Sequence, residues 1–197
     1  HRCIHRRHRS HPRSAGPAAG RLSGHRDHTA HAAGLHHQLC IYESLLRFDD
    51  KLQPQPNLAT AWTVAKDGLT YTFKLKQGVS WHDGKPFTAD DVVFTCDRFM
   101  RALNPRFRVG LLSVSSIKAL DAHTVEFKLN YPFAAFLGLF DTSSCSIAPR
   151  HLFENVDLGK PLTGTPVGTG PYKFKAWVRG SHIHLVRNEA YHDAGFP

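Results

Sequence analysis

The sequence lacks several features that would assign a protein class at once. No stretch approaches the roughly 18 consecutive apolar residues that a helix needs to cross a bilayer, so we predict no transmembrane segment in this chain. Methionine occurs once and cysteine four times in 197 residues, and no two cysteines form a C-x-x-C pair. The scattered cysteines exclude a zinc knuckle and a thioredoxin-like redox motif.

Acidic residues are also scarce relative to basic ones, and the excess charge lies at the front of the chain. Residues 1–40 hold seven Arg and one Asp, which accounts for most of the formal net charge of +9. Residues 1–21 are rich in His, Arg, Pro, Gly and Ala without helical or strand periodicity, so we predict a disordered His/Arg-rich tail there. The tail has no apolar core of a secretory signal peptide, and no signal peptide is visible in this chain.

Two functional interpretations of this tail are weaker than a solvated segment. A metal site there would use His1, Cys3, His5, His8 and His11. A disordered tail cannot supply the fixed geometry and supporting hydrogen bonds that such a site needs. The arginines suit phosphate contacts, but no aromatic residues alternate with them and no nucleic-acid-binding motif follows. We therefore predict no metal site and no nucleic-acid partner.

Residues 70–103 have the clearest local pattern. Tyr71, Phe73 and Leu75 alternate with polar residues, which is typical of a strand with one buried face. Thr88 is placed to cap a helix, and Asp91 then favours the positive end of the helix dipole. The apolar stripe expected on this helix is Val92, Cys96, Phe99 and Leu103. Buried aromatic residues are expected at Trp62, Trp81, Phe87 and Phe94.

The rest of the chain alternates helical and strand patterns. After Asn104 we expect an irregular stretch as far as Ser116, followed by a one-sided strand around residues 125–129. Pro132 is expected to start the next helix, because proline is tolerated in a first helical turn. Two paired strands are predicted at residues 172–177 and 182–187. This succession indicates an α/β fold.

Two pairs of residues invite a catalytic interpretation. His82 next to Asp83 has the chemistry of a metal ligand or a general base, but nothing nearby in the sequence completes a site, so we interpret His82 as a packing or hydrogen-bonding residue. Cys145 with His151 as its base would make a nucleophile pair. The residues between them match no cysteine-hydrolase pattern, and we predict no catalytic residue.

Two longer runs resemble a known family. They are WHDGKPFTADDVVF at residues 81–94 and PVGTGPYKF at residues 166–174. Both are similar to signatures of the extracytoplasmic solute-binding proteins of the peptide/nickel ABC-importer family, family 5. The resemblance covers about residues 40–197. It implies an N-terminal fragment with an α/β fold, an incomplete periplasmic-binding-protein clamshell with only the first lobe and its small subdomain.

The resemblance also implies a division of the chain. The expected parts are a disordered tail at residues 1–21, the start of the first lobe at 22–47, a small α/β subdomain at 48–160, and a truncated return into the first lobe at 161–197.

The function implied by the resemblance is that of the solute-binding component of an ABC importer, which captures oligopeptides or dipeptides without enzymatic activity and without a cofactor. Its partners would be the peptide or small solute and the permease subunits. Its location would be periplasmic, or extracellular and membrane-anchored. The alternative within transport is a carrier of nickel chelates or other small solutes. The alternative from another class is a noncatalytic surface interaction fragment or a nonfunctional truncation.

Ligand-facing residues are expected in the irregular segments that join regular elements, where binding residues concentrate. The candidates are Phe107 as an apolar wall, the polar run Thr142, Ser143, Ser144 and Cys145, and the loop Gly168, Thr169 and Gly170. Gly168 and Gly170 permit close backbone approach, so their N–H and C=O groups are suited to hold a peptide main chain. A tight turn into the following strand accounts for the same glycines equally well.

Overall fold

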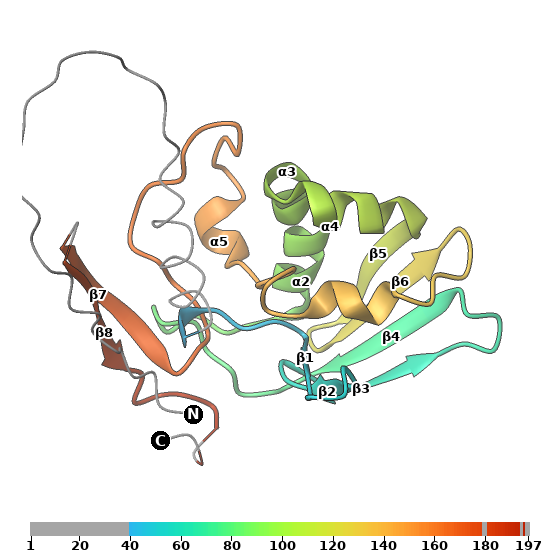
Figure 1. The fold of residues 1–197 in the computed structure, drawn as a ribbon, viewed down its shortest axis with the longest axis horizontal. Coiled ribbons are helices and arrows are strands. Elements are labelled where there is room, and N and C mark those ends of the chain that lie inside the picture. The colour runs from blue at the N-terminus through green and yellow to red at the C-terminus, as the bar shows by residue number, and fades with distance from the viewer. Residues whose placement is uncertain (1–39, 179–180, 194, 196–197) are drawn as a thin grey trace, which may run out of the picture.

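The computed structural model describes residues 40–178, 181–193 and 195, so the predicted tail lies outside the described residues (Figure 1). The strands are β1 (Leu46–Phe48), β2 (Pro54–Pro56), β3 (Ala59–Val64), β4 (Thr70–Leu75), β5 (Val114–Asp121), β6 (Thr124–Leu129), β7 (Tyr172–Val178) and β8 (His182–Arg187). The helical segments are α2 (Ala89–Phe94), the π-helical η1 (Thr95–Phe99), α3 (Met100–Leu103), α4 (Pro105–Gly110), α5 (Arg150–Phe153), and the 3-10 segments η2 (Leu111–Ser113) and η3 (Phe136–Phe140). This mixture agrees with the predicted α/β class.

A four-stranded antiparallel sheet in the order β3-β4-β6-β5 organises the core. Along β4, Tyr71, Phe73 and Leu75 are buried, as the alternating pattern predicts. Phe73 lies opposite Val125 on β6, and Tyr71 lies opposite Phe127. Both predicted one-sided strands are therefore confirmed, and they are antiparallel neighbours in the sheet.

The helices lie on one side of this sheet. Figure 1 shows α2, α3 and α4 stacked over the strands. Phe73 and Phe127 of the sheet meet Phe107 of α4 and Phe136 and Phe140 of η3, and none of the five side chains is exposed. Their rings pack edge-on, with contacting centroids 5.1 to 6.3 Å apart. Edge-to-face packing places the positive ring edge against the negative ring face, so this cluster adds to the stabilisation that burial provides.

The predicted capped helix is confirmed as α2. Thr88 is its N-cap in an extended conformation. The backbone N–H of Thr88 donates to the Asp91 carboxylate at 3.0 Å, which closes the first turn. The aromatic residues expected in the core are buried at Trp81, Phe87 and Phe94 and half-buried at Trp62.

The predicted stripe on this helix is wrong at its C-terminal end. Val92 and Cys96 are fully buried, whereas Phe99 is half-buried and Leu103 is 39% exposed. The cause is the π-helical segment at Thr95–Phe99. A π turn holds more residues than an α turn, so it rotates the residues that follow it away from the α-helical spacing. Steps of three and four no longer return to the core after it.

The prediction of an irregular stretch after Asn104 is also wrong. Asn104 ends α3, but its side chain also caps α4, with Oδ1 accepting from the Phe107 N–H at 3.1 Å. Pro105 occupies the first turn of α4, where its missing N–H costs nothing. The pair that stops one helix therefore starts the next, and η2 and β5 follow without a long loop.

The helix predicted to start at Pro132 begins later and is of another type. The 3-10 segment η3 starts at Phe136, and Phe136 and Phe140 point into the core. Phe133 precedes this segment and Leu137 lies within it, and both are half-buried. This short 3-10 segment places two buried phenylalanines, Phe136 and Phe140, over the sheet.

Strands β7 and β8 form the predicted antiparallel hairpin, with Trp177 opposite Ile183. In Figure 1 this hairpin lies beyond α5, away from the four-stranded sheet. Leu45 and Leu46 precede the predicted boundary at residue 48 and belong to the same core as Phe73. The division of the chain at residues 48 and 160 stays a prediction. Within the described ranges, no helix is long and apolar enough to cross a membrane.

Replacing Phe73 by alanine tests the aromatic cluster. We expect Phe73→Ala to lower the free energy of unfolding by about 3 to 5 kcal/mol, because a large buried ring is lost and its neighbours cannot fully collapse. Chemical denaturation followed by circular dichroism measures this. The control is Thr63→Ala on the exposed side of β3, which should change the value by less than about 0.5 kcal/mol. Equal effects of the two substitutions would contradict the assigned core.

Candidate ligand-binding groove

A groove of about 620 Å³ opens where three segments meet. One wall comes from the helical segments η1, α3 and the start of α4, the second from the chain between η3 and α5, and the third from the chain before β7. The lining residues are Tyr42, Phe99, Met100, Leu103, Asn104, Pro105, Thr142, Ser143, Ser144, Ser146, Ile147, Ala148, Phe153, Leu162, Thr163, Gly164, Thr165 and Pro166. The lining combines hydroxyl and amide groups with an apolar wall.

The hydroxyl-rich wall, Thr142 to Ser146, is held in place by its own hydrogen bonds. The Asp141 carboxylate accepts from the Ser144 N–H at 2.6 Å and from the Ser143 hydroxyl at 2.7 Å. The Ser146 hydroxyl donates to the Thr142 carbonyl at 2.8 Å. The turn is thus preorganised, so that binding a ligand there costs little further ordering.

Asn104 joins this turn to the helical wall. While its Oδ1 caps α4, its Nδ2 donates to the Ser144 carbonyl at 2.9 Å. From the sequence, Asn104 was expected only to mark the start of an irregular stretch, and its place in the groove lining was not predicted. The signal was present, because asparagine before proline is a favourable N-cap.

Tyr42 completes the polar part of the lining. Burial raises the pKa of Tyr42, and a hydrogen bond with the backbone of Val167 opposes that rise. The phenol therefore stays neutral and able to hydrogen-bond around neutral pH. Leu103, which leaves the helix core after the π turn, is exposed because it faces the groove.

The predicted site residues that precede the glycine loop divide into two groups. Thr142, Ser143 and Ser144 line the groove. Phe107 and Cys145 lie behind its walls with no exposed surface, Phe107 against Phe140 and Cys145 against Cys96. The ligand-facing role predicted for these two is not supported, because each packs into the core instead.

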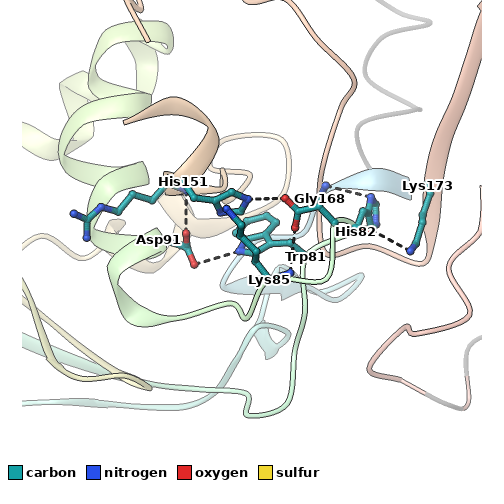
Figure 2. A network of polar contacts seen from close by, with 9 residues as sticks. Trp81, His82, Lys85, Asp91, His151, Gly168 and Lys173 are labelled. Atoms are coloured by element: carbon teal, nitrogen blue, oxygen red, sulfur yellow. Dashed lines mark hydrogen bonds and ion pairs between the residues drawn. The ribbon is translucent and has the colours of Figure 1, made fainter. Parts of the chain in front are cut away.

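The glycine loop, Gly168 to Gly170, is buried too, and the N–H and C=O groups of both glycines already have partners, whereas the buried Thr169 hydroxyl has none among the described residues. The backbone N–H of Gly168 donates to the ring nitrogen Nδ1 of His82 at 3.2 Å (Figure 2). The backbone N–H of His82 donates to the Gly168 carbonyl at 2.9 Å. The Gly170 carbonyl accepts from Asn188 Nδ2 at 3.0 Å and lies 2.9 Å from His82 Nε2. The Gly170 N–H donates to the carbonyl of Ile41 at 2.9 Å. The two glycines therefore make contacts within the protein, and their N–H and C=O groups are not presented to the groove.

His82 is held as a neutral imidazole by this contact. Its Nδ1 faces a backbone N–H, which can only donate, so Nδ1 accepts and Nε2 carries the proton toward Gly170. Burial lowers the pKa of His82, and the charge on Lys173 lowers it further, against the raising effect of the Gly170 hydrogen bond. The structural interpretation of His82 agrees with these contacts.

The rest of the 81–94 motif is a hydrogen-bonded network centred on Asp91 (Figure 2). The buried Asp91 carboxylate accepts from the Trp81 indole N–H at 3.2 Å, the Thr88 N–H at 3.0 Å and the Arg150 N–H at 2.9 Å. These three bonds tie the turn, the helix start and α5 to one carboxylate.

A contact between His151 and Asp83 extends this network. His151 Nε2 lies 2.6 Å from the Asp83 carboxylate. Burial by itself would raise the pKa of Asp83, but hydrogen bonds from His151 and from the Lys85 N–H outweigh it and lower that pKa. His151 is thus engaged with Asp83 while the Cys145 thiol faces Cys96, and burial raises the pKa of Cys145 well above its ordinary value. A buried thiol that resists ionisation is a poor nucleophile.

The comparisons with known proteins agree with these observations. Residues 53–197 match the model of the bacterial extracellular solute-binding proteins, family 5. The chain belongs to this family. It is 35% identical over 159 residues to the glutathione-binding protein GsiB of Pectobacterium atrosepticum and 36% identical over 173 residues to the dipeptide-binding protein of Escherichia coli. These alignments cover 80% and 77% of this chain, and 30% and 32% of those proteins.

Solved structures of the family have the same fold. NikZ from Campylobacter jejuni, in complex with Ni(L-His), matches with a TM-score of 0.71 at 35% identity over 78% of this chain and 31% of that chain. The oligopeptide-binding protein AppA from Bacillus subtilis, in complex with a nonapeptide, matches with a TM-score of 0.66 at 32% identity over 78% of this chain and 31% of that chain. The chain thus spans about a third of the length of its family members, which agrees with a partial clamshell.

Adding a methyl group to the glycine loop tests the internal contact. A Cβ at Gly168 would lie 1.9 Å from the Ile41 carbonyl oxygen, so we expect Gly168→Ala to lower the free energy of unfolding by about 3 kcal/mol or more. The matched control is Gly138→Ala, where a Cβ would meet nothing within 4 Å. It should change that free energy by less than about 1 kcal/mol in either direction. Thermal or chemical unfolding of both variants decides, and a harmless Gly168→Ala would refute the packing described.

The lowered pKa of His82 predicts a pH dependence of stability. In the unfolded chain this histidine titrates near about 6.5, so below that pH the unfolded state binds more protons and the free energy of unfolding falls until the lower folded pKa is passed. We expect His82→Asn, which cannot titrate, to lose less stability than the wild type between about pH 7.5 and 5.5. Denaturant titrations at several pH values measure both slopes, with His184→Asn on the exposed face of β8 as the control. Identical slopes in wild type and His82→Asn would contradict the assignment.

Proposed function

We propose that this chain is part of a solute-binding protein that captures short peptides, oligopeptides or dipeptides, for an ABC importer. The observation that carries the proposal is the groove lined by Asn104, Thr142, Ser143, Ser144 and Ser146 in a chain of this family. Hydroxyl and amide groups hydrogen-bond to a peptide main chain regardless of its side chains. The groove volume also falls within the range of about 300–1,000 Å³ that is usual for small-ligand sites.

The character of the lining supports binding without chemistry. Among the described residues that line the groove, none is a carboxylate, an imidazole, an ammonium group or a thiol. Phe99, Met100 and Phe153 supply apolar surface opposite the hydroxyls. Such a surface suits the neutral interior of a peptide, and we propose that the charged ends of the peptide are bound outside this groove. The relatives carry the names of binding proteins as well.

The family membership supports a location and partners. We propose that the protein works in the periplasm, or outside the cell and anchored to the membrane, and that it delivers its solute to permease subunits. Family 5 is described as extracellular.

A second candidate is a carrier of nickel chelates. It is favoured by the match to NikZ, whose structure holds Ni(L-His). The imidazoles of His182 and His184 on β8 are exposed and lie outside the groove lining. A chelate would therefore bring its own metal ligands and use the groove only for hydrogen bonds.

Nuclear magnetic resonance distinguishes the two solutes. We expect trialanine, added to the ¹⁵N-labelled 197-residue chain, to shift the amide signals of Asn104 and Thr142 to Ser146. Because the chain spans about a third of the length of its relatives and would make only part of the ligand contacts, we expect a dissociation constant weaker than about 1 µM. A nickel–histidine chelate should leave these signals in place if the solute is a peptide. Shifts with the chelate alone would favour the second candidate.

Substitutions locate the binding surface. Ser144→Leu places an apolar side chain in the hydroxyl wall and should abolish the shifts caused by trialanine. The matched control, Ser115→Leu on exposed β5, should leave them unchanged. No shifts at peptide concentrations of about 1 mM, or shifts confined to other parts of the chain, would sink the proposal.

A further inference from the structure

Two thiols that the groove does not use face each other behind its walls. Cys96 lies in the π-helical segment η1, and Cys145 lies within the hydroxyl-rich wall, between Ser144 and Ser146. Both side chains have no exposed surface, and their sulfur atoms are 4.0 Å apart across 49 positions of sequence. Neither cysteine belongs to the motifs at residues 81–94 and 166–174. Only the tertiary fold brings Cys96 and Cys145 together.

The backbones on both sides of this pair are already joined. The Thr95 hydroxyl donates to the Ala148 carbonyl at 3.2 Å and accepts from the Ala148 N–H at 3.0 Å. Asn104 holds the Ser144 carbonyl from the far side. A disulfide bond is about 2.05 Å long, so the sulfurs must approach by roughly 2 Å. The surrounding hydrogen bonds keep the two segments in register while the side chains close this gap.

We propose that Cys96 and Cys145 form a structural disulfide that ties the helical wall of the groove to its hydroxyl-rich wall. Cys96 precedes Phe99 and Met100 of one wall, and Cys145 adjoins Ser144 of the other. The inference rests on the extracytoplasmic location in the proposed function, because disulfides form and persist in oxidising compartments. The crosslink restricts the unfolded chain and holds the empty groove in its binding geometry.

The oxidant is a small-molecule disulfide or a disulfide oxidoreductase. The thiolate of one cysteine attacks the sulfur–sulfur bond of the oxidant, which releases one thiol and leaves a mixed disulfide. The second thiolate attacks the protein sulfur of that mixed disulfide and releases the other thiol. The two cysteines thus lose two protons and two electrons, and the oxidant is reduced to two thiols.

The timing of this reaction follows from burial. In the folded chain the Cys145 thiol is enclosed, and burial raises its pKa, so thiolate is scarce and the oxidant has no access. The bond therefore forms while the chain folds, before η1 closes over Cys145. Once formed, it is shielded from reductants by the same enclosure.

Refolding of the full chain tests the proposal without any substitution. The protein is unfolded with denaturant and reductant, then refolded either in a glutathione redox buffer or under reduction. After alkylation in denaturant and digestion, mass spectrometry should find a Cys96–Cys145 crosslinked peptide only in the oxidised sample. The oxidised protein should also melt roughly 10 °C higher than the reduced one, as expected for a crosslink that closes a loop of this length.

Variants assign the bond. Cys40→Ser should keep both the crosslink and the shift in melting temperature, whereas Cys96→Ala should lose both. Two alkylated thiols at Cys96 and Cys145 after oxidative refolding would overturn the proposal, as would pairing of either one with Cys3 or Cys40. An unchanged melting temperature on oxidation would overturn it too. None of these measurements uses a solute, so failure of the disulfide and failure of peptide binding are told apart.

Discussion

The docking of His82 against the glycine loop is the contact on which the rest of the arrangement depends. One imidazole bonds to Gly168 and Gly170 at once, and the absence of side chains there lets the loop approach the Ile41 backbone. Leu162 to Pro166, which form the third wall of the groove, run directly into this loop. The position of that wall and the start of β7 therefore follow from a contact made more than 80 residues earlier in the chain.

Asp91 likewise joins segments that are distant in sequence, through the bonds of its carboxylate to Trp81 and Arg150. A buried carboxylate is costly unless its lone pairs are filled, and three N–H donors fill those of Asp91. By binding Arg150 as well as Trp81, it sets the spacing between α2 and α5. That spacing determines how the chain before α5, with its hydroxyl-rich wall, lies against η1. The motif that is most diagnostic of the family thus builds the scaffold and does not touch the groove.

The proposed binding surface is rigid and carries no charged side chain among the described residues that line it. The hydroxyl-rich wall is braced by Asp141, by Asn104 and by the packing of Cys145, so its polar groups are presented in one geometry. A neutral, preorganised surface recognises features that many solutes share, which agrees with relatives named for glutathione and for dipeptides. The chain spans about a third of the length of these relatives.

The sequence by itself determined the elements whose signals are local. The alternation at Tyr71, Phe73 and Leu75 and the cap at Thr88 depend only on neighbours in the chain, and both are confirmed. The family was also readable from the two runs at residues 81–94 and 166–174. Part of the site was readable in the same way, because Thr142, Ser143 and Ser144 form a polar run between regular elements.

Only the tertiary structure decided which side chains face the groove. A π turn rotates Leu103 out of the core, and no local spacing rule contains that turn. Phe107 and Cys145 look like loop residues in the sequence, but the ring of Phe140 and the thiol of Cys96 enclose them. By sequence, Gly168 and Gly170 were equally suited to contact a ligand or another segment of the chain. In the structure, His82 hydrogen-bonds to the Gly168 N–H and to the Gly170 carbonyl. In each case the deciding partner lies far away in sequence, so burial and pairing were settled only when the segments packed together.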